Sequence, residues 1–178
     1  MKRILDILVA LVILVASSPL DLLIALGIRL DSPGPVIIST RRIGRDGQLF
    51  FHYRFRTMAG HPLQKTHFGR LIGNLSLDDL PTLWNVIRGD MSLIGPRPEI
   101  PENVDVADAT WQKVLSVRPG LSGLALLTLR ENYNKTSVAE RIEPEVYYAE
   151  HSSLLFDVQL MLKTLYWWLK MGHVKGHF

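Results

Sequence analysis

The chain has 178 residues, of which 47% are hydrophobic and 21% are charged, and its formal net charge is +3 at pH 7. This length predicts one domain, or one domain with a membrane anchor. The chain contains no cysteine, which excludes disulfides, thiolate metal sites and a cysteine nucleophile. The positive charge favours an anionic partner: phospholipid, a nucleotide phosphate or nucleic acid.

The first element is an apolar run over residues 7–28. As one straight helix it would be long enough to cross a bilayer core of about 30 Å. Ser18 and Pro19 interrupt it, because proline lacks an N–H and its ring clashes with the carbonyl four residues earlier. We expect two shorter helices, the second with Ser18 as its N-cap and Pro19 at its first position. Neither helix would then span the core alone.

Basic residues flank both ends of this run, with Lys2 and Arg3 before it and Arg29 after it. A spanning helix usually has its excess of Lys and Arg on one side only. A re-entrant hairpin places both ends on the cytoplasmic face, and the Ser18 hydroxyl could serve the broken backbone. A kinked span and a cleaved signal peptide are the alternatives. The favoured interpretation is a re-entrant membrane hairpin over residues 1–30.

Residues 31–178 are expected to form a second unit that is mainly helical. Turn residues and alternating apolar positions predict a β-hairpin, and apolar positions at helical spacing predict amphipathic helices. The expected elements are strands at 36–40 and 48–55 joined by a turn at 44–47, an irregular segment at 58–73, and helices at 80–87, 103–116, 143–151 and 154–165. The predicted fold class is therefore mainly α with a small β-hairpin.

Two adjacent carboxylates, Asp78 and Asp79, stand at the start of the helix expected at 80–87. Helix capping alone would explain them, because Ser76 and Asp79 fit a capping box and acidic residues favour a helix N-terminus. Pro81 fits best if the helix begins at Asp79, which leaves Asp78 free to face a ligand. Such a pair can bind Mg²⁺ beside a diphosphate, or one carboxylate can act as nucleophile while the other assists.

Arginines in turns and rigid loops supply the complementary charge. Arg97 lies within Gly-Pro-Arg-Pro and Arg118 within Arg-Pro-Gly, so their backbones are rigid. A planar guanidinium on a rigid backbone suits phosphate. For each arginine taken singly, a solvated surface position is the alternative. The candidate substrate-binding residues are Arg54, Arg56, Arg97, Arg118 and Arg130.

The last predicted helix carries Trp167 and Trp168 between Lys163 and Lys170. Indoles at the headgroup level with lysines reaching toward water are typical of a helix that lies in a membrane interface. Packing in a soluble core is the alternative.

These motifs together closely resemble the bacterial initiating sugar transferases, the small monotopic phosphoglycosyl transferases. The resemblance covers nearly the whole chain. It rests on Arg-Phe-Arg-Thr-Met at 54–58, Leu-Ser-Leu-Asp-Asp-Leu-Pro at 75–81, Leu-Trp-Asn-Val at 83–86, Gly-Asp-Met-Ser at 89–92, Gly-Pro-Arg-Pro at 95–98 and Val-Arg-Pro-Gly at 117–120.

The resemblance implies transfer of a phospho-sugar from a UDP-sugar to polyprenyl (undecaprenyl) phosphate, with release of UMP, at the start of glycoconjugate synthesis. In the family an Asp-Glu dyad acts through a covalent aspartyl-phosphosugar. Asp78 matches the nucleophile and Asp79 stands at the glutamate position, and Mg²⁺ held by both would offset the diphosphate charge.

The resemblance also implies where the protein works. It places a monotopic catalytic domain, residues 31–178 with interfacial amphipathic helices, on the cytoplasmic face of the bacterial inner membrane. Membrane phospholipid is then a partner, nucleic acid is not, and a homodimer is left open.

The chain departs from the family pattern at several positions. Asp79 replaces the dyad glutamate, Gly73 an arginine and Arg54 a lysine, and residues 126–129 are apolar where the family has a polar segment before Arg130. An active transferase with an unusual donor or acceptor is the main hypothesis. A non-catalytic membrane homologue that binds lipid phosphate or a partner enzyme is the alternative.

Overall fold

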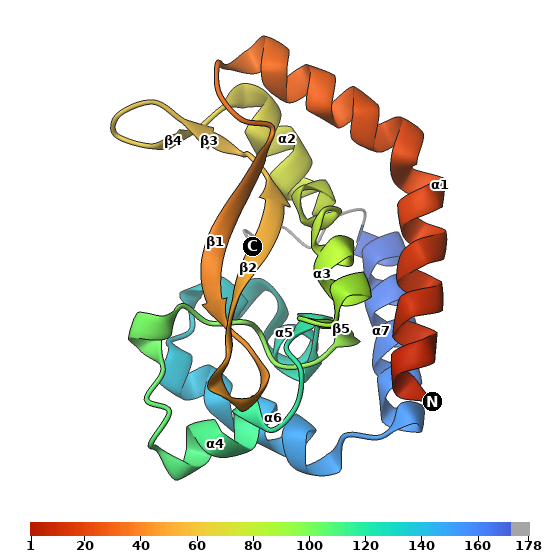
Figure 1. The fold of residues 1–178 in the computed structure, drawn as a ribbon, viewed down its shortest axis with the longest axis vertical. Coiled ribbons are helices and arrows are strands. Elements are labelled where there is room, and N and C mark those ends of the chain that lie inside the picture. The colour runs from red at the N-terminus through yellow and green to blue at the C-terminus, as the bar shows by residue number, and fades with distance from the viewer. Residues whose placement is uncertain (172–178) are drawn as a thin grey trace.

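The computed structural model describes residues 1–171, apart from the side chains of Arg130, Glu131, Asn134 and Met171. Helices dominate these residues, and the strands pair into three small two-stranded sheets (Figure 1). The predicted fold class, mainly α with a small β-hairpin, is therefore confirmed.

α1 (Lys2–Asp31) is one helix of 30 residues, so the expected division into two helices is wrong. Pro19 lies inside it and cannot donate to the carbonyl of Val15. The Ser18 hydroxyl donates to that carbonyl instead, at 2.8 Å, and does not cap a second helix. Because the orphaned carbonyl is satisfied locally, the helix bends rather than ends, and Figure 1 shows its change of direction.

Both ends of α1 are attached to the same globular body. At the N-terminal end, Lys2 Nζ lies 2.6 Å from Asp157 Oδ2, and the buried Asp6 accepts hydrogen bonds from the Ser92 hydroxyl and the Leu93 N–H. At the C-terminal end, the Arg56 guanidinium donates to carbonyls of the last turn and of the loop beyond it, including Ser32 O at 2.7 Å. Among the described helices, α1 alone is long and apolar enough to cross a membrane, and 11% of its most apolar stretch is buried.

The predicted β-hairpin is present as β1 (Ile37–Ile43) and β2 (Leu49–Phe55), which pair antiparallel. Thr40 lies opposite His52, and Arg42 lies opposite Phe50. Directly opposed residues share a face, and so do residues two apart on one strand. One face of the hairpin therefore carries Arg42, His52 and Arg54.

α3 (Thr82–Arg88) covers the free edge of β2. Asn85 accepts from the backbone N–H of Tyr53 at 3.0 Å and donates to the carbonyl of Phe51 at 2.7 Å. These bonds satisfy edge groups that would otherwise be unpaired. The helix expected at 80–87 is confirmed, although it begins at Thr82, after Pro81, and ends at Gly89 in the left-handed region.

The segment expected to be irregular, residues 58–73, is ordered. It forms β3 (Met58–Ala59), β4 (Gln64–Lys65) and α2 (His67–Asn74). The Thr66 hydroxyl caps α2 by accepting from the Gly69 N–H at 2.9 Å. This cap is a local signal for a helix, but the glycines of the segment lower its helix propensity and favoured an irregular structure.

The later helices differ from the prediction mainly in their limits. α4 (Ala109–Leu115) begins late because Asp108 caps it, and α6 (Val138–His151) begins early because Ser137 and Glu140 form a capping box. α7 (Leu154–Met171) begins where the helix at 154–165 was predicted and continues to Met171. The turn predicted at 44–47 is present and contains the short 3₁₀ helix η1 (Arg45–Gly47). Elements that were not predicted include the 3₁₀ turns η2 (Leu77–Asp79), η3 (Pro101–Asn103) and η4 (Arg130–Lys135), and the helix α5 (Leu124–Leu129).

Two proline-glycine loops meet through the parallel strands β5 (Ser92–Ile94) and β6 (Gly120–Ser122). A Cβ on Gly95 would clash with the backbone of residues 118–120, and a Cβ on Gly120 would clash with Gly95. The glycines therefore allow backbone to pack on backbone. This contact places Arg97 beside the loop that follows β6.

Candidate active site

Arg54 of β2 joins the two adjacent carboxylates. Its Nη2 lies 2.6 Å from Asp78 Oδ2, and its Nε lies 2.6 Å from Asp79 Oδ1. Ser76 adopts a left-handed conformation and makes no capping hydrogen bond with its side chain. The capping-box explanation of the pair is therefore wrong, and the turn η2 presents both carboxylates to one guanidinium.

Asp78 is buried, with 4% of its surface exposed. Its Oδ2 binds Arg54, whereas its Oδ1 has no hydrogen-bond partner. Burial raises the pKa of Asp78 to about 6; the charge of Asp79 acts in the same direction and Arg54 opposes both. A buried oxygen without a partner is costly, which is typical of a group that serves a ligand or a reaction.

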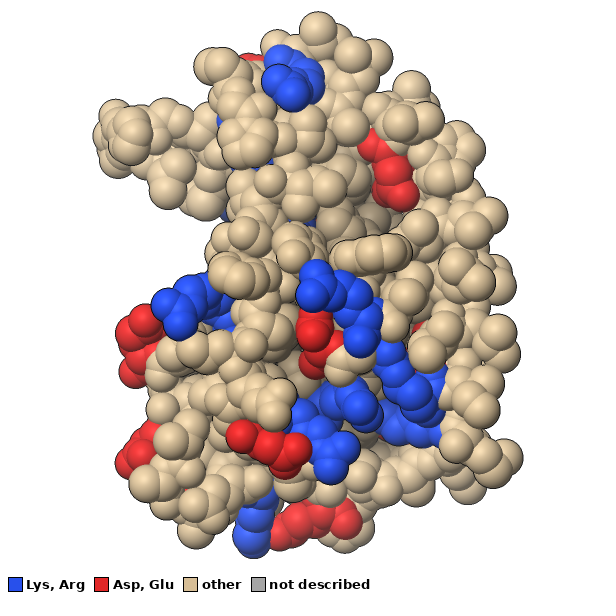
Figure 2. Space-filling model, in the orientation of Figure 1, with Lys and Arg blue, Asp and Glu red and all other residues tan. Residues whose placement is uncertain are grey.

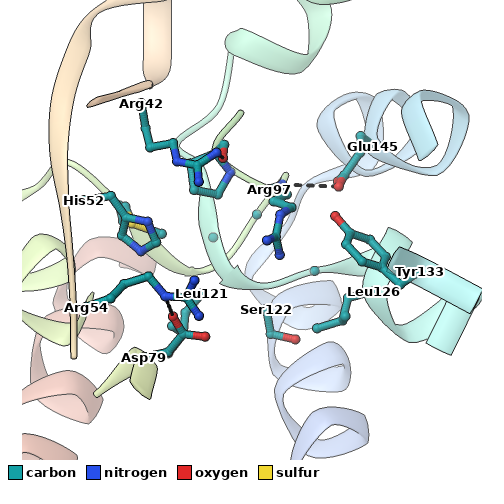
Figure 3. Close-up of a pocket in the computed structure, with 15 residues that line it drawn as sticks. Arg42, His52, Arg54, Asp79, Arg97, Leu121, Ser122, Leu126, Tyr133 and Glu145 are labelled. Atoms are coloured by element: carbon teal, nitrogen blue, oxygen red, sulfur yellow. Dashed lines mark hydrogen bonds and ion pairs between the residues drawn. The ribbon is translucent and has the colours of Figure 1, made fainter. Parts of the chain in front are cut away.

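An open cleft of about 540 Å³ lies beside this pair (Figure 3). The hairpin contributes three side chains to one wall, and the two proline-glycine loops contribute the backbone between the walls. The lining residues are Arg42, His52, Arg54, Asp79, Met91, Gly95, Arg97, Pro98, Gly120, Leu121, Ser122, Gly123, Leu126, Tyr133 and Glu145.

The opposite wall combines Arg97, Tyr133 and Glu145. The Arg97 guanidinium carbon lies 5.5 Å from the centre of the Tyr133 ring, and the Arg97 backbone N–H donates to Glu145 Oε1 at 3.2 Å. Glu145 is 7% exposed and its Oε2 has no partner. Burial raises the pKa of Glu145 to about 7.

The charge distribution of the cleft suits an anion. Arg42, Arg54 and Arg97 all line it, and guanidinium groups bind phosphate oxygens well. Figure 2 shows Lys and Arg gathered in the middle and lower part of this face, while the outer edge formed by α1 is nearly free of charge.

The predicted site residues fall into three groups. Arg54, Asp79 and Arg97 line the cleft, and the buried Asp78 lies behind its wall, joined to Arg54. Arg56 and Arg118 are not among the described residues that line the cleft. Arg56 binds carbonyls at the C-terminal end of α1. Arg118 Nε donates a hydrogen bond of 2.9 Å to the carbonyl of Gly89, the C-cap of α3. The side chain of Arg130 lies outside the described part of the chain.

Sequence reasoning missed four ionisable side chains of the cleft: Arg42, His52, Tyr133 and Glu145. The first two could have been found, because Arg54 was a candidate and residues two apart on a strand share a face. Tyr133 and Glu145 come from distant helical segments, and no local pattern connects them to the hairpin.

The carboxylate pair fits a magnesium ion that is shared with phosphate. In the described residues, no group of three or more His, Asp or Glu side chains could hold a metal. Mg²⁺ commonly uses one or two carboxylates together with water and substrate phosphates. The unpaired Oδ1 of Asp78 and the neighbouring Asp79 provide such a donor set.

A second hollow, apolar and of about 1280 Å³, lies between α1, the hairpin and α3. Tyr53 lines this groove, and the next residue, Arg54, lines the charged cleft. Because successive side chains of a strand point to opposite faces, the groove and the cleft lie on opposite faces of the hairpin. The groove is lined by Leu14, Ser18, Asp21, Leu22, Ala25, Val36, Ile37, Tyr53, Phe55, Leu80, Pro81 and Trp84.

Comparison with known proteins identifies the family of this chain. The family profile described as bacterial sugar transferase matches residues 1–171. The chain belongs to this family. Exopolysaccharide production protein ExoY of Sinorhizobium fredii is 34% identical, over 92% of this chain and 83% of that protein.

Two further relatives carry more specific names. UDP-N-acetylgalactosamine-undecaprenyl-phosphate N-acetylgalactosaminephosphotransferase of Aeromonas hydrophila is 37% identical over 92% of this chain but only 42% of its own length. UDP-glucose:undecaprenyl-phosphate glucose-1-phosphate transferase of Caulobacter vibrioides is 35% identical over 92% of this chain and 68% of its own. The matched part of each relative thus corresponds to nearly all of this bacterial sugar transferase.

Proposed function

We propose that this bacterial sugar transferase moves a phospho-sugar from a UDP-sugar to undecaprenyl phosphate or a similar polyprenyl phosphate, releases UMP, and so initiates glycoconjugate synthesis. The observation that carries the proposal is the buried Asp78, which is held by Arg54 beside an arginine-lined cleft. The names of the relatives from Aeromonas and Caulobacter support the same donor and acceptor classes.

The geometry suggests how the reaction would proceed. Arg54 holds Asp78 Oδ2, so the unpaired Oδ1 is the oxygen available for attack on the phosphorus that carries the sugar. The bond from this phosphorus to the bridging diphosphate oxygen breaks, and UMP leaves. An oxygen of the acceptor phosphate then attacks the same phosphorus and frees the Asp78 carboxylate.

The surrounding charges would make this attack feasible. A carboxylate and a diphosphate repel each other, and Arg42, Arg54 and Arg97 offset that repulsion within the cleft. Mg²⁺ held by Asp79 and the diphosphate would supply further charge neutralisation, which leaves Asp78 Oδ1 free to attack. Asp79, which keeps its own contact with Arg54, would hold the guanidinium in place while Asp78 reacts.

The apolar groove supports a polyprenyl acceptor. It begins on the surface of α1 and reaches Tyr53, the residue before Arg54. A hydrocarbon chain in this groove would bring its phosphate toward the carboxylate pair from the side opposite to the nucleotide. Donor and acceptor would then approach Asp78 from different directions.

The contacts of α1 support a re-entrant membrane mode. Lys2 and Asp6 bind the globular body at one end of the helix, and Arg56 binds the other end. A helix with both ends on one body cannot place them on opposite sides of a bilayer without taking that body into the membrane. We therefore propose a monotopic protein on the cytoplasmic face of the bacterial inner membrane.

Exposed apolar residues of both α1 and α7 would face the membrane under this proposal. On α7, residues of the interfacial pattern are exposed, including Leu165, Trp168 and Leu169. These side chains would contact membrane phospholipid while the globular part of residues 32–153 remains in water.

UMP release tests the proposed reaction. The purified full chain is incubated with a panel of UDP-sugars and Mg²⁺, with and without polyprenyl phosphate. We expect UMP from at least one donor, release that depends on the acceptor under multiple turnover, and loss of release in EDTA. Binding of polyprenyl phosphate without UMP from any donor would instead support the non-catalytic alternative.

A further inference from the structure

His52 lines the cleft and carries an unpaired polar atom that the proposed reaction does not use. The side chain is 9% exposed, and its ring lies between Arg42 and Arg54 on the hairpin wall, opposite Arg97 (Figure 3). Its Nε2 lies 3.0 Å from Thr82 Oγ1. Its Nδ1 is buried and has no hydrogen-bond partner.

The contacts of Thr82 fix the tautomer of this ring. A threonine hydroxyl has a single proton, and Thr82 donates it to the carbonyl of Tyr53 at 3.0 Å. The bond between Thr82 and His52 therefore requires the proton on Nε2 of His52. Nδ1 is left with a lone pair and can only accept.

The surroundings keep the ring neutral. Burial lowers the pKa of His52 to about 3, and the positive charges of Arg54, Arg42 and Arg97 act in the same direction. Nδ1 therefore stays an uncharged acceptor throughout the pH range in which an assay would be run.

An uncharged acceptor complements the other groups of this cleft. Arg42, Arg54 and Arg97 only donate hydrogen bonds, so they suit phosphate oxygens and cannot accept from the hydrogen of a hydroxyl or N–H group. A carboxylate on the same wall would accept from those groups but would repel a diphosphate. A neutral imidazole nitrogen accepts without repulsion, and a buried acceptor gains most from a ligand that supplies the missing donor.

We propose that Nδ1 of His52 accepts a hydrogen bond from a hydroxyl or ring N–H group of the bound sugar nucleotide and so contributes to the choice of donor substrate. This inference rests on the proposed function and goes beyond it, because it assigns a specificity role to a residue outside the carboxylate pair and the arginines.

Two substitutions separate the two nitrogens of the ring. His52→Asn places an amide oxygen near the position of Nδ1 and loses the contact with Thr82. His52→Gln reaches toward Thr82 with its amide and leaves no acceptor near Nδ1. We expect His52→Gln to raise the KM for the UDP-sugar about ten-fold, with kcat and the KM for polyprenyl phosphate changed less than about two-fold. His52→Asn should recover most of the affinity.

Phe51→Gln provides the matched control, because Phe51 lies on the same strand, points to the opposite face and is 55% exposed. It should leave both KM values unchanged. Equal losses in His52→Asn and His52→Gln, accompanied by lower thermal unfolding midpoints, would mean that His52 acts only through its packing, and the inference would be overturned.

Substrate analogues identify the bonded group. Deoxy and N-methylated analogues of the preferred UDP-sugar each remove one hydrogen-bond donor. One of them should lose about ten-fold in kcat/KM with the unmodified protein and lose nothing further with His52→Gln. Equal sensitivity of the two proteins to every analogue would overturn the role of His52 while the proposed function stands. Absence of UMP release from every donor by the unmodified protein would overturn both.

Discussion

The two carboxylate oxygens of Asp78 have different surroundings, because Oδ2 accepts a hydrogen bond from Arg54 and Oδ1 has no hydrogen-bond partner. Arg54 also binds Asp79, so it would keep a partner if Asp78 lost its charge. The residues that surround the reacting centre thus have separable roles, and single substitutions can test them.

Asp78→Asn removes the charge of the proposed nucleophile and changes its volume little. UMP release should fall at least about a thousand-fold, because an amide cannot form the covalent phosphosugar. The thermal unfolding midpoint in detergent should stay close to that of the unmodified protein, since Arg54 retains Asp79. Turnover near the original level in Asp78→Asn would contradict the assignment.

Asp79→Glu restores the family dyad. It should leave the rate of UMP release unchanged or raise it.

Glu145 predicts a dependence of stability on pH. Burial raises its pKa to about 7 from an ordinary value of 4.5, so the folded protein binds a proton that the unfolded chain has lost in this interval. The free energy of unfolding should therefore fall as pH rises from 4.5 to 7, by up to about 1.4 kcal/mol per pH unit for this group.

Glu145→Gln tests this expectation, because glutamine keeps an acceptor oxygen for the Arg97 N–H and does not titrate. The decline in unfolding midpoint between pH 5 and pH 8 should be smaller in the variant than in the original protein. Glu150→Gln, at an exposed ion pair with Lys113, is the control and should leave the decline unchanged. An identical decline in all three proteins would show that Glu145 titrates normally.

At the scale of elements, α2 shows how two glycines in one helix differ. A Cβ on Gly73 would have no atom within 4 Å, whereas a Cβ on Gly69 would clash with the backbone carbonyl of Thr57. Gly73→Ala should raise stability by up to about 1 kcal/mol, since alanine is the better helix former. Gly69→Ala should lower it by about 1–3 kcal/mol through overpacking. Thermal unfolding of the two variants checks the opposite signs.

The apolar groove gives a prediction about the acceptor. Ala25→Trp, on the groove side of α1, would fill part of the hollow. The KM for polyprenyl phosphate should rise about ten-fold or more, while the KM for the UDP-sugar stays the same. Leu26→Trp, at an exposed neighbouring position, is the control and should change neither value. An effect of Ala25→Trp on the donor alone would place the acceptor elsewhere.

Elements were predictable where their signal was local. The hairpin strands and α7 followed from apolar spacing, and α3 was located to within two residues because Gly89 ends it. β5 and β6 could not be predicted, because each has three residues and exists only through the contact between the loops of Gly95 and Gly120. Short strands of this kind are decided by tertiary packing rather than by propensity.

At the scale of the molecule, the attachment of both ends of α1 predicts its topology. A cysteine inserted after Met1 and Asp46→Cys should be labelled from the same side of oriented vesicles, and the cysteine-free background makes the labels specific. Ser18→Ala with Pro19→Ala restores the backbone hydrogen bond to the Val15 carbonyl and should straighten α1. A straight helix cannot keep both ends on the body, so the contacts of Lys2 and Asp6 should break and the labels should appear on opposite sides. Labels on opposite sides in the original protein would exclude the re-entrant mode.

The sequence by itself determined the fold class, the carboxylate pair, the family resemblance and the apolar character of α1, because apolar spacing, adjacent motifs and composition are local properties. Tertiary structure alone decided that both ends of α1 attach to one body, that Arg56 and Arg118 hold helix ends, and that His52 and Glu145 enter the cleft. The physical reason is that each of these outcomes depends on a partner distant in sequence. A guanidinium binds whichever carboxylate or carbonyl the fold brings to it, and only the folded chain fixes that choice.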